Sequence, residues 1–219
     1  EYRVPVIFLI DECIGHMTEK VVIPKADEID VLPRKFSKEA PGNYLPYKHN
    51  ENLVPEMVKA GDGYRIHVTG LTHDERGYPE MSADRQEILV HRLVNKIRMN
   101  ADKIVKYEEK DIDDADVVTV SYGITSRVVL KAIELAKRDG IKVGYLRLIV
   151  VWPFPEKRIL ELAKSKIKSF VVAELNYGQI YYEVERCAAG NAKTILVPHG
   201  GGTVHEPEEI YKKIVEAAS

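Results

Sequence analysis

Residues 116–140 read DVVTVSYGITSRVVLKAIELAKRDG, and this stretch decides the fold. Its first part, DVVTVSYG, is a short run rich in β-branched residues that ends in a glycine, which predicts a buried strand. Its second part, TSRVVLKAIELAKRDG, has apolar residues at helical spacing, a Thr or Ser at the cap position and a glycine at its end, Gly140. The stretch therefore predicts one strand followed by one helix.

The same alternation continues to the C-terminus. Strands are predicted near 116–121, 142–149, 169–174 and 193–197. The later strands are followed by the helical patterns EKRILELAKS, YGQIYYEVERCAAG and EPEEIYKKIVEAAS. Four strand–helix units predict a parallel, three-layer α/β domain over residues 111–219. In such sheets, ligands and partners meet the loops that follow the carboxyl ends of the strands.

The first half of the chain is less regular. Residues 4–10, VPVIFLI, predict a strand covered on both faces. Since one strand cannot make a domain, residues 1–22 are expected to be the last part of a domain. Residues 23–80 are rich in proline and glycine and are expected to form an irregular linker and interface loop. Residues 81–110 are expected to form a connecting helix with Ser82 as its cap.

Composition excludes several classes of protein. The formal net charge of −2 argues against nucleic-acid binding. No apolar run reaches the length of a membrane-spanning helix. The two cysteines, Cys13 and Cys187, lack metal-ligand spacing, which favours reduced thiols in a cytoplasmic protein. Few Asn and Gln beside many Lys, Arg and Glu hint at a thermophilic source.

Polar residues follow the predicted strands at the carboxyl edge of the sheet. Gly123, Thr125, Ser126 and Arg127 lie where a helix begins, so free N–H groups there could bind an anion; ordinary helix capping is the alternative. In the next such loop, Asn176 and Gln179 could contact a ligand or partner, or could tie adjacent loops together. The PHGGG stretch at 198–202 resembles the oxyanion loop of esterases, but the chain has no GxSxG nucleophile motif, which excludes a hydrolase of that type.

The stretch 63–79, GYRIHVTGLTHDERGYP, combines glycines with many charged side chains. We expect it to form an interface or substrate-proximal loop; its polar candidates are His67, Thr72, His73, Asp74, Glu75 and Arg76. A metal site is the alternative, but the side chains of three adjacent residues diverge and no HExxH spacing occurs. We therefore expect no metal here and expect Arg76 to pair with Asp74, with Glu75 or with a carboxylate across an interface.

Five stretches occur together in an order that resembles one family: DECIGHMTEKVVIP, GYRIHVTGLTHDERGYP, SYGITSR, LRLIVVWPFP and ELNYGQ. They are similar to the alpha subunit of 2-oxoacid:ferredoxin oxidoreductases, most closely to the 2-oxoglutarate type. The resemblance implies the end of a pyrimidine-binding domain of a thiamine enzyme, followed by a domain similar to the C-terminal domain of transketolase.

The resemblance also implies a reaction. Such an enzyme oxidatively decarboxylates a 2-oxoacid with coenzyme A, giving an acyl-CoA, carbon dioxide and reduced ferredoxin. Thiamine diphosphate lies between two subunits, the beta subunit holds its diphosphate and Mg²⁺, and an iron–sulfur cluster belongs to a partner. The family's YPITP-type motif is absent from this sequence, so no catalytic residue is expected here and this chain alone is expected to be inactive.

Two other readings stay open at this point. The chain could be a non-catalytic binding or assembly module on a transketolase-type α/β domain. It could also belong to an enzyme similar to pyruvate dehydrogenase or transketolase, which shares the C-terminal fold, although the THDERGYP stretch argues against this.

Overall fold

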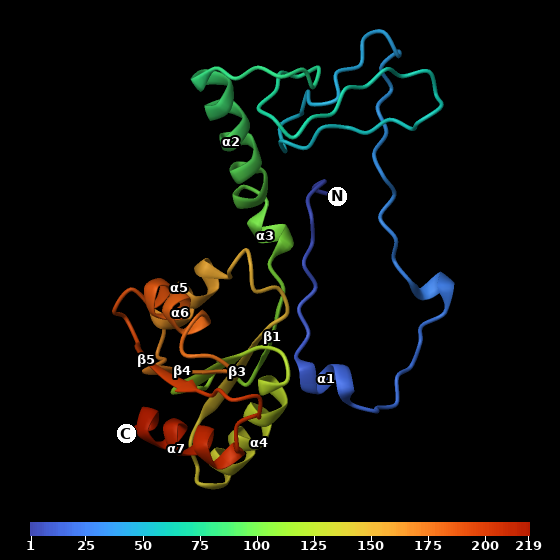
Figure 1. Cartoon of the computed structure of the whole chain (residues 1–219). Coiled ribbons are helices and arrows are strands. Elements are labelled where there is room, and N and C mark those ends of the chain that lie inside the picture. The colour runs from blue at the N-terminus through green and yellow to red at the C-terminus, as the bar shows by residue number, and fades with distance from the viewer. The chain divides into compact units, whose positions relative to one another are not determined.

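The computed structural model describes all 219 residues, which divide into two compact units (Figure 1). The first unit comprises Glu1–Ile7 and Glu19–Lys103, and the second comprises Phe8–Thr18 and Ile104–Ser219. None of the helices combines the length and the apolar composition that a membrane-spanning helix needs.

A five-stranded sheet forms the centre of the second unit, with the strand order β1-β3-β2-β4-β5. The strands are β1 (Tyr107–Lys110), β2 (Val117–Ser121), β3 (Val143–Leu148), β4 (Ser169–Glu174) and β5 (Lys193–Pro198). The last four are parallel and lie within a residue or two of their predicted positions. Every residue of β2 and β4 is buried, which explains why these strands consist of small and apolar residues apart from Glu174 at the end of β4.

The sheet is mixed rather than wholly parallel, because β1 pairs antiparallel with the edge of β3. The sequence YEEK gives β1 an alternating, half-exposed pattern without an apolar run, so the strand was missed. The prediction of one connecting helix over 81–110 was therefore wrong for residues 107–110, which form β1.

Two helices cover each face of the sheet, which confirms the three-layer prediction. On one face α5 (Glu156–Ala163) and α6 (Ile180–Ala188) bury Ile159 and Val184 in a core with β2, β3 and β4. On the other face α4 (Thr125–Arg138) and α7 (Pro207–Ala218) bury apolar side chains against the same strands (Figure 1). Because β2–β5 are parallel, their carboxyl ends lie at the same edge of the sheet.

The first unit is built around one long helix, α2 (Ala83–Arg98). The Ser82 hydroxyl accepts a hydrogen bond from the N–H of Arg85 at 3.3 Å, so the predicted cap is present. A break at residues 99–100 separates α2 from the short α3 (Ala101–Ile104), so the connection is not one continuous helix. Residues 24–79 contain only one 3-10 turn, η1 (Ala26–Glu28), and three isolated bridges.

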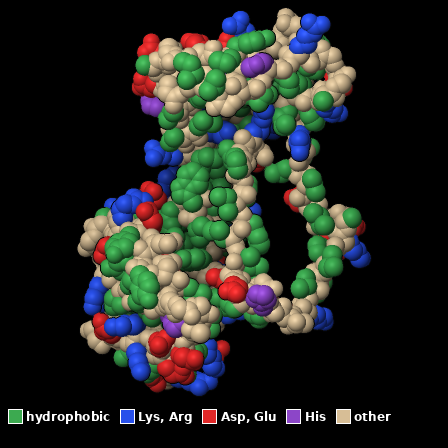
Figure 2. Space-filling model, in the orientation of Figure 1, with side chains coloured by type: hydrophobic (Ala, Val, Ile, Leu, Met, Phe, Trp, Pro, Cys, Tyr) green, Lys and Arg blue, Asp and Glu red, His purple; other side chains and the backbone are tan.

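The strand predicted at 4–10 is absent. These residues run extended into a short helix, α1 (Glu12–His16), without pairing to another strand. Val6, Ile7 and Phe8 are more than 80% exposed, and hydrophobic side chains line this segment and the extended residues near 21–23 (Figure 2). An apolar run predicts a strand only where a neighbouring strand satisfies its backbone, and the chain places none beside it.

Candidate functional site

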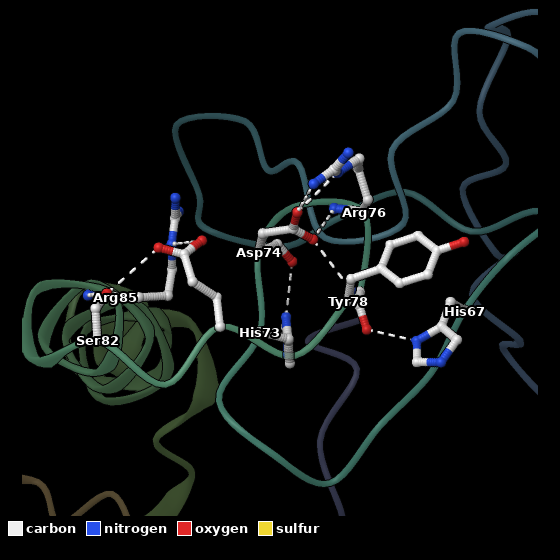
Figure 3. A network of polar contacts seen from close by, with 9 residues as sticks. His67, His73, Asp74, Arg76, Tyr78, Ser82 and Arg85 are labelled. Carbon is white, nitrogen blue, oxygen red and sulfur yellow. Dashed lines mark hydrogen bonds and ion pairs between the residues drawn. The ribbon is translucent and has the colours of Figure 1, made fainter.

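The loop Thr72–Gly77 is organised by the carboxylate of Asp74 (Figure 3). This carboxylate accepts hydrogen bonds from the backbone N–H groups of Arg76 at 2.9 Å and Tyr78 at 3.0 Å, and from the Arg76 Nε at 2.7 Å. Desolvation opposes ionisation, but these donors outweigh it and lower the pKa of Asp74 below its usual value. Arg76 forms an ion pair with Asp74, which is one of the predicted alternatives, so both partners of this pair belong to the loop itself.

Gly77 allows the loop to approach the chain at His67. Gly77 has a φ of 88°, and a Cβ at this position would overlap the carbonyl oxygen of His67. The Nδ1 of His67 lies 2.6 Å from the Gly77 carbonyl oxygen, and its ring stacks on Tyr78 with centroids 4.7 Å apart. A glycine is therefore required to hold the two sides of the loop together.

The two histidines of this stretch do not converge. The Nδ1 of His73 lies 2.8 Å from its neighbour's carbonyl oxygen at Asp74, and its buried ring packs on Tyr47 with centroids 3.9 Å apart. His67 is directed to the other side of the loop (Figure 3). Thr72 donates to the Gln86 side chain on α2, whereas Glu75 is exposed. No three His, Cys, Asp or Glu side chains gather in a way that could hold a metal ion.

A small cleft of about 50 Å³, partly open to solvent, lies between this loop and α2 in the first unit. Its lining residues are Tyr47, His49, His73, Asp74, Glu75, Arg85, Ile88, Leu89 and Arg92. The α2 members follow helical spacing, which is the signal that could have added Arg85 and Arg92 to the sequence-based candidates. Sequence reasoning had no signal for Tyr47 and His49, which lie in an irregular segment.

At the carboxyl edge of the sheet, Asp11 occupies the start of α4. Its Oδ2 accepts a hydrogen bond from the N–H of Ile124 at 2.7 Å. Gly123 has a φ of 57°, and a Cβ there would overlap the same carboxylate. The expected Thr or Ser cap is thus replaced by an aspartate, and the N–H of Ile124, which could have bound an anion, is not free. Thr125 and Ser126 are buried, and Ser126 bonds to Ser121, while Arg127 lies in the first turn of α4.

Glu174, which is completely buried, closes the start of α6. Its carboxylate accepts hydrogen bonds from the N–H groups of Gln179, Ile180 and Tyr181 at 2.9–3.0 Å. The hydroxyl of Tyr122 also donates to Glu174 at 3.2 Å. Burial, together with the neighbouring carboxylate, raises the pKa of Tyr122 to about 12.

Asn176 joins this network to the neighbouring loop. Its Nδ2 donates to the Tyr122 hydroxyl at 3.0 Å, and its Oδ1 accepts from the N–H groups of Gly178 and Gln179. Both Asn176 and Gln179 are therefore engaged within the chain. Tyr122, which links the loops after β2 and β4, was missed because nothing local distinguishes it from a packing tyrosine.

Comparison with known proteins decides the family. Residues 115–210 match the family described as pyruvate:ferredoxin oxidoreductase core domain II. Residues 1–92 match the thiamine diphosphate-binding family of pyruvate flavodoxin/ferredoxin oxidoreductases. The chain belongs to the 2-oxoacid:ferredoxin oxidoreductases. The resemblance drawn from the five sequence stretches is thereby confirmed.

Individual relatives of this oxidoreductase chain give the same result. It is 48% identical to the 2-oxoglutarate synthase subunit KorA of Methanothermobacter marburgensis over 98% of its own length and 57% of the relative's. It is 32% identical to the ketoisovalerate oxidoreductase subunit VorB of the same organism, over 54% of that relative. The chain thus spans about half the length of the curated relatives it matches.

A solved structure is also similar to this oxidoreductase chain. The 2-oxoglutarate:ferredoxin oxidoreductase from Magnetococcus marinus, which has 2-oxoglutarate, coenzyme A and succinyl-CoA bound, matches with a TM-score of 0.77 and 25% identity. The match covers 90% of this chain and 34% of that one.

The residues of this oxidoreductase chain do not by themselves fit a magnesium-bound thiamine diphosphate. A diphosphate commonly binds at free helix N-termini, and magnesium takes carboxylate ligands. Here the starts of α4, α6 and α7 are closed by Asp11, Glu174 and the capping box of Glu206. No cluster of metal-binding side chains completes such a site.

Proposed function

We propose that this chain is part of the alpha subunit of an enzyme that oxidatively decarboxylates 2-oxoglutarate with coenzyme A, giving succinyl-CoA, carbon dioxide and reduced ferredoxin. The observation that carries the proposal is the 48% identity to a 2-oxoglutarate synthase subunit along nearly the whole chain. The lower identity to a ketoisovalerate oxidoreductase subunit, 32%, favours 2-oxoglutarate over a branched 2-oxoacid.

The cofactors are proposed to be held mainly outside this chain. Thiamine diphosphate supplies the carbanion chemistry of the decarboxylation when bound, and we assign its diphosphate and Mg²⁺ to the beta subunit, together with an iron–sulfur cluster. The engaged helix starts at Asp11, Glu174 and Glu206 support this allocation. We therefore assign no catalytic residue to this chain and expect it to be inactive alone.

The part played by this chain is structural and positional. We propose that residues 1–22 complete a pyrimidine-binding domain, that 23–80 are a linker with an interface loop at Thr72–Gly77, and that 111–219 form the transketolase-like domain. The exposed apolar residues 4–10 support contact with further parts of that pyrimidine-binding domain. The expected partners are the beta subunit and, through the complex, ferredoxin. We expect the complex in the cytoplasm, without nucleic acid or a membrane as a partner.

Reconstitution tests this proposal. The complete alpha subunit containing this chain is purified with its native beta subunit and supplied with 2-oxoacids, coenzyme A and a viologen acceptor. We expect viologen reduction with 2-oxoglutarate above the rates with pyruvate and 2-oxoisovalerate, and none by the 219-residue chain alone. If the alpha and beta subunits assemble normally but the complex reduces no acceptor with any 2-oxoacid, the result would favour the non-catalytic assembly module instead.

A further inference from the structure

One face of α2 carries two cations close to a third from the N-terminal segment. Arg92 and Lys96 are four residues apart, so they lie on the same side of the helix. Lys96 is only 2% exposed, and its Nζ donates one long hydrogen bond, 3.3 Å, to the backbone carbonyl of Arg3. The buried ammonium of Lys96 therefore has a neutral acceptor and no carboxylate.

Arg3 is fixed at the same place. Its Nη1 donates to the backbone carbonyls of Pro55 at 2.8 Å and Glu56 at 3.0 Å. Tyr44 donates to the same Glu56 carbonyl at 2.8 Å. These contacts orient the guanidinium of Arg3 without neutralising it, because its partners, two backbone carbonyl groups and the Tyr44 hydroxyl, are uncharged.

No carboxylate balances the three charges within the first unit. The carboxylates that line the adjoining cleft are Asp74, which is paired with Arg76, and Glu75, which is exposed. The carboxylate of Glu56, whose backbone carbonyl accepts from Arg3, forms no ion pair with it and is also exposed. The pKa of Lys96 is lowered by burial and by the charges of Arg92 and Arg3, and burial and Arg3 likewise lower the pKa of Arg92. Cations held together in this way are unfavourable unless an anion joins them.

We propose that Arg3, Arg92 and Lys96 form a binding site for a compact anionic group, a phosphate or a carboxylate, on the first unit. Arginine presents a planar fork of N–H donors that matches the oxygens of either group, and lysine adds a point charge. Arg92 also lines the cleft beside Tyr47, His49 and His73, so a small anionic ligand can reach Arg92 from solvent. The proposal does not depend on the reaction of the enzyme.

Thermal unfolding of the 219-residue chain with defined anions tests the site. Phosphate, pyrophosphate and succinate are each compared with sodium chloride at equal ionic strength. We expect at least one of them to raise the Tm in a saturable way, with phosphates or the dicarboxylate giving the larger shift according to the group the site takes. Calorimetric titration of the same anions then gives the Kd.

Variants separate this site from a general salt effect. Arg92→Gln and Lys96→Gln should each weaken the binding of the effective anion roughly tenfold or more, the loss expected for one charge-assisted hydrogen bond. Arg98→Gln, on the exposed side of the same helix, should leave the Kd unchanged. Lys96→Gln should also raise the Tm in chloride alone, because it removes a buried unpaired charge.

Two results would overturn the proposal: no saturable shift with any of the three anions, or the same shift in wild type, Arg92→Gln and Arg98→Gln. If Lys96→Gln fails to fold, the comparison of Arg92→Gln with Arg98→Gln decides alone.

Discussion

The carboxyl edge of the sheet and the inner face of α2 differ in how their charges are balanced. At the sheet edge, Asp11 and Glu174 each meet the N–H groups at a helix start. On α2, Arg92 and Lys96 lie near Arg3 without a carboxylate. In the first region the chain itself satisfies the N–H groups of these helix starts, whereas in the second region no carboxylate of the chain pairs with the cations. This difference indicates that the face of α2, rather than the two helix starts, is where an external anion is expected to act.

The largest effect on stability is expected for Glu174→Ala, which tests the hydrogen-bond network at the carboxyl edge of the sheet. The substitution leaves the half-buried N–H groups of Ile180 and Tyr181 and the Tyr122 hydroxyl without their acceptor, so we expect a loss of about 3–5 kcal/mol in the free energy of unfolding. Chemical denaturation measures it. Glu208→Gln, an exposed change in the first turn of α7, should alter stability by less than about 1 kcal/mol. Equal effects of both variants would show that Glu174 is not essential to the network.

Gly123→Ala tests the contact between Asp11 and α4. Strain at a φ of 57° and overlap with the Asp11 carboxylate should together lower stability by about 1–3 kcal/mol. Gly140→Ala is the matched control, because Gly140 also has a positive φ but has open space around it. In the Asp11→Ala background the penalty of Gly123→Ala should fall to that of Gly140→Ala. A penalty that is unchanged in this background would contradict the contact.

Tyr122 predicts a dependence of stability on alkaline pH. Its pKa is raised to about 12 in the folded chain, from about 10 for an unperturbed tyrosine. The unfolded form then loses its proton first as the pH rises, so the contribution of Tyr122 is complete below pH 10 and is lost between about pH 10 and 12. Denaturation series across this range should show a shallower fall for Tyr122→Phe than for wild type. Parallel curves would exclude this role of Tyr122.

The smallest effect on stability is expected for Arg76→Ala. The Arg76–Asp74 pair is solvent-exposed on the arginine side, and such pairs add little to folding. The thermal midpoint of the isolated chain should therefore stay unchanged, while association with the beta subunit weakens, as measured by the Kd of the complex. Arg65→Ala, another exposed arginine of this segment, is the control. Unaltered association of Arg76→Ala would remove the loop from the interface.

Sequence patterns predicted what is local and buried. The strands β2–β5 and the α2 cap at Ser82 followed from apolar runs and spacing, because these elements are enclosed by the chain itself. The edge strand β1 escaped because its YEEK sequence has no apolar signal. The prediction of a strand at 4–10 was wrong, because the apolar side chains of this run are exposed and no strand of this chain pairs with it.

The site was less predictable for a different reason. The loop at Thr72–Gly77 and its Asp74–Arg76 pair are separated by few residues, so their chemistry could be read locally. The contacts of Asp11 with Ile124 and of Lys96 with Arg3 join residues 113 and 93 positions apart. No spacing rule connects such residues, and only the fold brings them together.

Hydrogen exchange of the chain with and without the native beta subunit tests the central difference between the two units most directly. We expect amides of β2 and β4 to be protected in both conditions, whereas protection of Thr72–Tyr78 should rise when the beta subunit binds. A complex that forms while Thr72–Tyr78 exchanges as before, or that instead protects the carboxyl edge of the sheet around Gly123 and Asn176, would contradict the assignment of this loop to the interface.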